Sequence, residues 1–165
     1  AGSTWEKDVK ILQEVLNSNM DYKLIIAPHE LNNIEYLKKI QNSTFLSESD
    51  EESIDSFNVL IIDKMGILSK LYRYADIAYI GGGFGKGIHN TLEAIIYNIP
   101  VIFGPNYHNF QEAKELILLG IAKSIANSSE LKNAINNFGN TDITNSSKNY
   151  FNSKIGSVHK MIEMI

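Results

Sequence analysis

The sequence predicts an α/β fold, a Rossmann-like parallel sheet with helices on both faces. Two patterns in the 165 residues predict it. Short apolar runs alternate with segments whose apolar residues recur at helical spacing, and a glycine-rich turn joins one apolar run to a helix start. Strands separated by helices form right-handed βαβ units, which build a covered parallel sheet. We expect one domain over residues 1–165, with ligands at the carboxyl ends of its strands.

In the first half of the chain, the pattern predicts helix, strand, helix, strand and helix over residues 5–17, 22–27, 31–40, 59–62 and 66–74. The first helix carries apolar residues three and four apart, namely Val9, Leu12, Val15 and Leu16. We interpret residues 1–4 as a turn leading into it, with Ser3 or Thr4 as N-cap, and as the start of a domain excised from a longer protein. The acidic segment 47–56 is interpreted as a solvated loop without a function.

In the second half, the predicted strands are the apolar runs at 75–80, 100–103 and 121–125. Each strand is followed by a segment of helical spacing, and the predicted helices cover 89–97, 109–119, 129–138 and 145–164. The glycine-rich turn lies between the strand at 75–80 and the helix at 89–97. The order strand, loop, helix therefore recurs along the chain.

The composition of the chain limits the classes of function that it can have. A hydrophobic content of 44% and a charged content of 21% are typical of a globular domain. A net charge of −4 argues against a nucleic-acid partner, which requires a clustered basic face. The absence of cysteine excludes disulfides and thiolate metal sites. No apolar run approaches the roughly 18–20 residues of a membrane-spanning helix.

The glycine-rich turn has five glycines in the seven residues 81–87. Glycine lets the backbone approach a ligand closely, and a helix start offers unpaired N–H groups to a phosphate, so the turn indicates a site for a nucleotide-linked compound. It does not match the dinucleotide fingerprint, because Lys86 or Ile88 occupies the third glycine position, nor the Walker pattern, because Gly87 follows Lys86. The alternative is a tight turn that needs positive φ angles.

Polar residues follow the glycines. His89, Asn90 and Glu93 are expected in the first turn of the next helix, with Asn90 and Glu93 on one face. A carboxylate can accept from two ribose hydroxyls, and an amide can donate to phosphate or sugar. The alternative is that Asn90 caps the helix, Glu93 favours its dipole, and His89 caps or packs.

Further candidates follow the other strands. His29 comes after the strand at 22–27, Met65 and Gly66 after 59–62, and Asn109 and Glu112 after 100–103. Asn109 and Glu112 also fit a capping box. The sequence shows no Ser/His/Asp triad, paired carboxylates or metal-ligand spacing, so we expect no catalytic residue, cofactor or metal in this domain.

Taken in order, these motifs resemble one family, the 3-deoxy-D-manno-octulosonic acid (Kdo) transferases of lipopolysaccharide assembly, in their C-terminal donor-binding domain. The resemblance covers most of the chain and rests on Ala1–Trp5, Ile26–His29, Asp63–Gly66, Gly81–Gly83, Gly87–Glu93 and Gly104–Glu112. It implies the C-terminal half of a GT-B glycosyltransferase, which transfers Kdo from CMP-Kdo to a lipid A precursor. It also implies an N-terminal GT-B domain that carries the general base, and a location at the cytoplasmic face of the bacterial inner membrane.

The resemblance implies roles for the candidate residues. Met65 and Gly66 would line the cytidine pocket, the segment from Gly87 through Ile88 and His89 to Asn90 would hold the phosphate, and Glu93 would bind the ribose. The donor would be flanked by His29, Asn109 and Glu112. Gly82 and Gly83 complete the expected substrate-binding set, and the isolated domain is expected to bind donor without transferring sugar.

The chain also departs from the family pattern. It lacks the arginine of a usual Pro-Arg-His at Pro28-His29, and Ile67 replaces the glutamate of Met-Gly-Glu. Gly83 replaces a usual serine and Ala94 a common proline, which indicates a divergent branch. Two alternatives remain open: the donor domain of another GT-B enzyme or a UDP-sugar epimerase, and a noncatalytic nucleotide-binding module.

Overall fold

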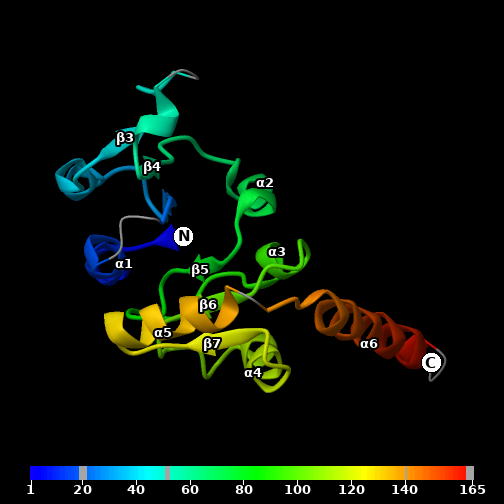
Figure 1. Ribbon diagram of the computed structural model, residues 1–165. Coiled ribbons are helices and arrows are strands. Elements are labelled where there is room, and N and C mark those ends of the chain that lie inside the picture. Colours follow the sequence, from blue (N-terminus) through cyan, green and yellow to red (C-terminus); the bar gives the residue numbers. More distant parts are fainter. Residues whose placement is uncertain (19–21, 51–52, 140, 163–165) are drawn as a thin grey trace.

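A seven-stranded sheet forms the centre of the computed structural model, which describes residues 1–18, 22–50, 53–139 and 141–162 (Figure 1). The strand order is β3-β4-β2-β1-β5-β6-β7, and neighbouring strands are parallel throughout. The strands are β1 (Gly2–Thr4), β2 (Leu24–Pro28), β3 (Ser43–Phe45), β4 (Val59–Ile61), β5 (Ala78–Ile80), β6 (Val101–Phe103) and β7 (Ala122–Ser124). The predicted Rossmann-like α/β fold is confirmed, as are the strands predicted from apolar runs.

The helices are α1 (Glu6–Ser18), α2 (Leu68–Leu71), α3 (Leu92–Ile95), α4 (Gln111–Leu118), α5 (Ser128–Phe138) and α6 (Thr144–Ile162), with the 3-10 helices η1 (Glu35–Lys39), η2 (Ile54–Ser56) and η3 (Tyr72–Tyr74). The helices predicted at 5–17, 66–74, 109–119 and 129–138 are confirmed by α1, by α2 with η3, by α4 and by α5. Helix α6 confirms the last predicted helix, whose final two residues lie outside the described residues.

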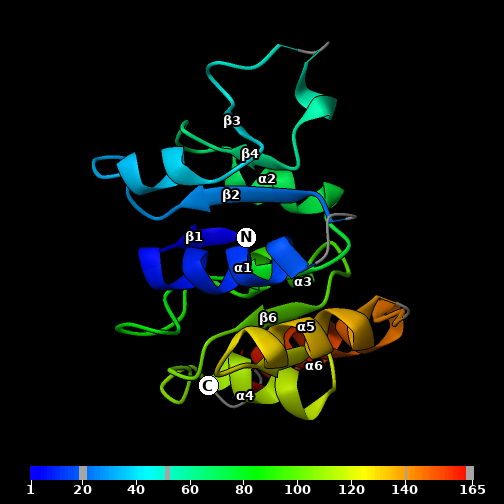
Figure 2. The ribbon, with the colours of Figure 1, turned by 60° about the vertical axis from the view of Figure 1, so that its left-hand side comes forward.

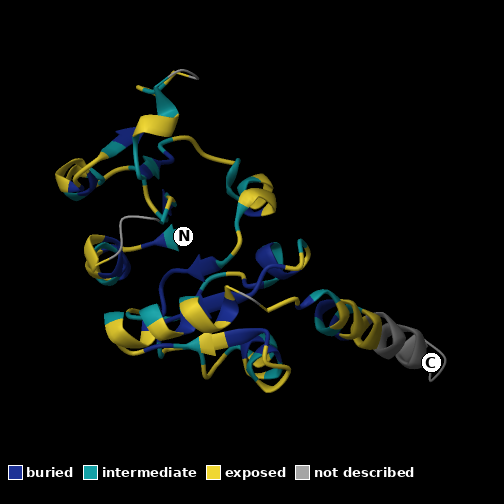
Figure 3. Ribbon diagram, viewed as in Figure 1, coloured by how far each residue is buried: buried dark blue, intermediate teal, exposed yellow. Residues whose placement is uncertain are grey.

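Helices cover both faces of the sheet (Figure 2). Tyr79 of β5 and Ile102 of β6 pack on one face with residues of α1 and α5. Ile80 and Phe103, their neighbours in sequence, pack on the other face with residues of α3, α4 and α6. Both strands are buried along their whole length (Figure 3). Burial on two faces explains why these strands are continuous apolar runs.

The prediction that residues 1–4 form only a turn is wrong, because this segment contains the central strand β1. Gly2 pairs with Ala27 of β2 on one side and with Ile80 of β5 on the other. The strand is held by its neighbours through backbone hydrogen bonds, among them one from the Gly81 N–H to the Gly2 carbonyl at 2.8 Å. Its small and polar residues carry no apolar signal.

The start of α1 also differs from the prediction, since neither Ser3 nor Thr4 is its N-cap. Both residues lie within β1, and Trp5 directly precedes the helix. The Trp5 N–H donates to the Asp8 carboxylate in the first turn at 2.8 Å. The helix start is therefore satisfied from within the helix.

The segment between β2 and β4 contains less helix than predicted. The predicted helix at 31–40 is reduced to η1, which buries Leu37, and β3 pairs with β4 where no strand was predicted. Tertiary pairing here overrides the local pattern. The acidic segment 47–56 includes η2, and its residues 51 and 52 lie outside the described residues.

The helix predicted at 89–97 is shorter than expected, because α3 begins only at Leu92 and ends at Ile95. The Asn90 side-chain oxygen accepts from the Leu92 N–H at 3.0 Å, and the His89 N–H donates to the Gly81 carbonyl at 3.2 Å. These bonds hold His89 and Asn90 in a turn against the glycine loop. Such local side-chain bonding competes with helix formation.

Candidate functional site

The sheet has a topological switch point between β1 and β5. From β1 the chain continues to its neighbour β2 on one side, and from β5 it continues to β6 on the other. The connections therefore diverge, and a crevice at the carboxyl ends of two such strands is the usual ligand position in open parallel sheets. The β1–α1 link and the glycine-rich turn after β5 meet here.

Asp8 joins the two sides of the switch point. Its carboxylate is buried, at 1% exposure, and accepts from three donors: the Trp5 N–H at 2.8 Å, the Gly82 N–H at 3.0 Å and the Tyr79 hydroxyl at 2.7 Å. Burial and then the Asp8 charge raise the pKa of Tyr79, so its hydroxyl stays a donor. Three hydrogen bonds offset the cost of burying the carboxylate.

Three aromatic rings stack at the same place, each from a different connection. The Trp5 and His29 ring centroids are 4.7 Å apart, and those of His29 and His89 are 4.2 Å apart. The Trp5 indole N–H also donates to Nε2 of His89 at 3.4 Å. Burial, and then the His29 charge, lower the pKa of His89 below its ordinary value, while the Asp8 charge acts in the opposite direction. We call these three side chains the ring column.

The functional reading of the sequence missed Asp8 and Trp5. A signal for Asp8 was present, because it lies four residues before Leu12 and so falls on the apolar stripe of α1. A charged residue on a buried stripe needs partners. Trp5 could have been found only by recognising β1 as a strand, since the carboxyl end of that strand places it at the switch point.

The glycine-rich turn has the positive φ angles that the alternative interpretation required. Gly82 has φ +91° and Gly87 has φ +139°. The Gly82 carbonyl accepts from the N–H groups of Gly85 at 2.9 Å and Gly87 at 3.2 Å. The turn is therefore closed by its own backbone, and glycine is needed there for conformation.

The loop after β6 braces this turn. The Asn106 side chain donates to the Gly85 carbonyl at 2.7 Å, and its backbone N–H donates to the Gly83 carbonyl at 2.9 Å. A Cβ on Gly83 would come within 2.6 Å of the Gly104 backbone. The serine that the family pattern has at Gly83 therefore does not fit this chain without a shift of the loop.

Asn90 and Glu93 lie together at the start of α3, as predicted. The Asn90 amide donates to the Glu93 carboxylate at 3.2 Å. The N–H groups of Gly87, Ile88 and His89 donate to backbone carbonyls. Those of Asn90 and Thr91 have no acceptor among the described residues, so the donors open to an anion lie at the end of the predicted phosphate segment.

The other predicted residues lie on flanking loops of the same edge. Met65 is 74% exposed after β4, and Gly66 has φ +82° with open space around it. Phe110, and not Asn109, directly precedes α4, and no side chain caps that helix. The Glu112 charge acts on Tyr150 and Lys154 of α6. The structure thus brings His29, the glycine turn, His89, Asn90 and Glu93 to the switch point, and Met65, Gly66, Asn109 and Glu112 to its sides.

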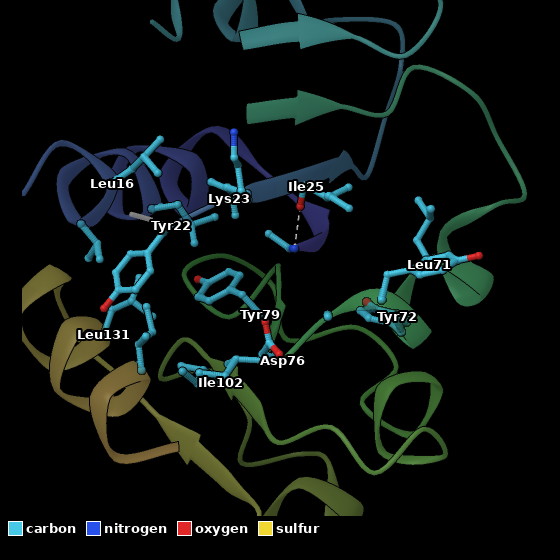
Figure 4. Close-up of a pocket in the computed structure, with 18 of the residues that line it drawn as sticks. Leu16, Tyr22, Lys23, Ile25, Leu71, Tyr72, Asp76, Tyr79, Ile102 and Leu131 are labelled. Carbon is cyan, nitrogen blue, oxygen red and sulfur yellow. Dashed lines mark hydrogen bonds between the residues drawn. The ribbon is translucent and has the colours of Figure 1, made fainter. Parts of the chain in front are cut away.

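A cavity of about 470 Å³ lies at the opposite edge, beside the starts of β1, β2 and β5 (Figure 4). None of the predicted site residues lines it. Among its lining residues are Leu12, Val15, Tyr22, Tyr79, Ile102 and Leu131.

Two further features are absent from the described residues, a metal-ligand cluster and a membrane-spanning helix. No cluster of three or more His, Cys, Asp or Glu side chains is placed to hold a metal ion. None of the described helices combines the length and the apolar character that crossing a membrane requires.

Several known proteins are similar to the chain, although no family model matches it. It is 38% identical over 148 residues, 85% of its length, to a bifunctional glycosyltransferase/methyltransferase of Fusobacterium nucleatum. It is 33% identical to the 3-deoxy-D-manno-octulosonic acid transferases of Chlamydia muridarum, over 70% of its length, and Aquifex aeolicus, over 71%. The chain covers 23%, 29% and 34% of these three relatives, a quarter to a third of each.

A solved structure is similar in fold. The C-terminal CMP-Kdo binding domain of WaaA from Acinetobacter baumannii matches with a TM-score of 0.66 and 25% identity, over 79% of this chain and 73% of that one. The fold is thus that of the C-terminal half of a GT-B enzyme. By sequence and by fold, the chain is a relative of the 3-deoxy-D-manno-octulosonic acid transferases and corresponds to their C-terminal domain.

Proposed function

We propose that this chain is the donor-binding domain of a Kdo transferase and binds CMP-Kdo in the crevice at the switch point. One observation carries the proposal: the chain matches a CMP-Kdo binding domain in fold and sequence. The position of its polar residues agrees with it, since open parallel sheets bind ligands at this edge. The full-length enzyme would transfer Kdo to a lipid A precursor at the cytoplasmic face of the bacterial inner membrane.

The start of α3 supplies groups suited to the nucleotide. The free N–H groups of Asn90 and Thr91 can donate to the phosphate, whose charge grows as CMP leaves. The Glu93 carboxylate can accept from two vicinal ribose hydroxyls, and the Asn90 amide orients it. Positioning of this kind favours the charge distribution of the transition state.

The surrounding loops would complete the pocket. Met65 and Gly66 offer backbone groups and an exposed thioether to the cytosine, and His29, Asn109 and Glu112 flank the sugar. The attacking hydroxyl belongs to the acceptor, and the base that deprotonates it would come from the N-terminal GT-B domain. We expect the isolated chain to bind CMP and not to transfer sugar.

Isothermal titration with CMP tests the pocket. Glu93→Ala should weaken binding at least about tenfold, because a charged hydrogen-bond acceptor is worth about 1.5–3 kcal/mol. Glu14→Ala, which removes an exposed carboxylate on the remote part of α1, is the matched control and should bind as the unaltered chain does. Absent binding, or equal affinity for all three proteins, would contradict the proposal.

The same titration with UMP separates the nucleotides. Tighter binding of UMP than of CMP would favour the donor domain of a UDP-sugar enzyme instead. Thermal shift under both nucleotides gives an independent measurement, since a ligand that binds the folded state raises its apparent stability.

A further inference from the structure

The ring column stands at the switch point with its end open to solvent. Trp5, the single tryptophan of the chain, is 42% exposed. The backbone N–H of His29 donates to the Thr4 carbonyl of β1 at 3.0 Å, and the backbone N–H of His89 donates to the Gly81 carbonyl at 3.2 Å. The rings are thus held by the backbone of β1 and of Gly81, the residue that follows β5.

The hydrogen bond within the column defines a protonation state. The Trp5 indole can only donate a hydrogen bond, so Nε2 of His89 must accept it with a free lone pair. The single N–H proton of the neutral imidazole ring is then on Nδ1. A second proton on His89 would remove the acceptor. It would also place a cation against His29 at a centroid distance of 4.2 Å. The hydrogen bond from Trp5 therefore requires a neutral His89.

The charges around His89 come from two elements. His29, after β2, disfavours protonation, and Asp8 of α1 favours it. Burial disfavours it most strongly, so the pKa of His89 lies below its ordinary value. A group in this position gains a proton readily when a negative charge arrives, because an anion within about 4–6 Å favours the cationic form.

We propose that the ring column is a proton-linked anion site, in which a phosphate or carboxylate that enters at the switch point binds protonated His89, so that binding takes up a proton and releases Trp5 from His89. The choice of CMP as ligand rests on the proposed function. The proton comes from solvent or buffer and forms an N–H bond at Nε2 of His89, and no bond of the ligand forms or breaks. By linkage, affinity rises as the pH falls, by up to about tenfold per pH unit for one proton.

Calorimetry in two buffers measures the proton. We expect CMP at pH 7 to give different heats in PIPES and in imidazole, which differ in ionisation enthalpy, with an uptake of up to about one proton per CMP. Emission from Trp5 should change on binding. Cytidine, which lacks the phosphate, should bind without proton uptake, which assigns the effect to the anion.

Variants locate the proton. His89→Phe keeps a stacking ring and removes the titrating group, so this variant should lose the uptake and the pH dependence of affinity. His89→Gln serves if His89→Phe does not fold by circular dichroism. The matched control is His108→Phe, because His108 stacks on Tyr107 at the same edge, outside the column, and its uptake should equal that of the unaltered chain.

The outcomes separate the two proposals. CMP binding with equal heats in both buffers, or uptake that survives in His89→Phe, would overturn the ring column as a proton-linked site and leave the proposed function standing. If CMP does not bind, the proposed function fails, and inorganic phosphate decides the inference. Buffer-dependent heats that disappear in His89→Phe support it, and absent binding or equal heats overturn it.

Discussion

The carboxyl edge and the amino edge of the sheet differ in their buried polar groups and in their empty volume. At the carboxyl edge the loops are closed by hydrogen bonds, and the buried Asp8 has three donors. At the amino edge a cavity of about 470 Å³ is lined mainly by apolar side chains. A well-formed apolar cavity is usually the first hypothesis for a ligand site. Here the fixed polar groups and the topology favour the opposite edge.

The difference teaches that preorganisation and empty volume are separate properties. Asp8, Asn90 and Asn106 each hold a loop of the carboxyl edge in one arrangement, which reduces the reorganisation that ligand binding requires. The amino edge contributes volume without directed donors. Substitutions at the two edges should therefore separate stability from binding.

The largest effect is expected for Asp8→Ala. It leaves the Tyr79 hydroxyl and two backbone N–H groups without their acceptor, and each buried unsatisfied group costs about 1–3 kcal/mol. Unfolding in urea should show a loss of about 3–5 kcal/mol, and CMP binding should weaken because the glycine turn loses its anchor. Asp76→Ala, an exposed carboxylate at the amino edge, is the control. Equal losses of stability in Asp8→Ala and Asp76→Ala would contradict the proposed difference between the two edges.

Leu131→Ala probes the amino edge. This α5 side chain is 1% exposed and lines the cavity, and truncating a buried leucine costs about 2–4 kcal/mol. The urea midpoint should fall while CMP affinity stays unchanged under folding conditions. Leu118→Ala on α4, where the side chain is 86% exposed, should leave both measurements unchanged. A weakened CMP affinity in Leu131→Ala would mean that the edges are coupled.

Gly83→Ser introduces the residue of the family pattern and tests how tightly the loops of the carboxyl edge are packed. Its Cβ would lie 2.6 Å from the Gly104 backbone, and overpacking costs about 1–3 kcal/mol. Gly85→Ser is the matched control, since a Cβ there meets nothing closer than 3.6 Å. Thermal unfolding should separate the two. Equal midpoints would show that the loop shifts freely and that Gly83 is not fixed by packing.

The fold could be predicted wherever burial leaves a mark in the sequence. Strands β5 and β6 are apolar because both of their faces are covered. Strand β1 has the same central position, yet Gly2 must be small because a Cβ would meet the Tyr72 hydroxyl. The short α3 was equally hidden, since the Asn90 bond that delays it depends on the position of the turn.

The candidate site was predictable in part for the same reason. Gly82, Asn90 and Glu93 follow from the local order of strand, glycines and helix. Asp8 and Trp5 instead make contacts across the sheet, and Asp8 lies 74 residues away from Gly82 in the sequence. A single sequence does not show which strands are neighbours, so contacts across the switch point required the structure.

The smallest effect is expected from pH and concerns the ring column alone. The pKa of His89 is lowered in the folded chain, so on acidification the unfolded chain takes up this proton first. The contribution to stability is present above about pH 6.5, the ordinary histidine value, and declines below it. The free energy of unfolding of the unaltered chain should fall more steeply between pH 7 and pH 5.5 than that of His89→Phe. If the free energy of unfolding depended on pH equally in both proteins, the environment of His89 would not differ from solvent, and the ring column would not be a buried part of the carboxyl edge.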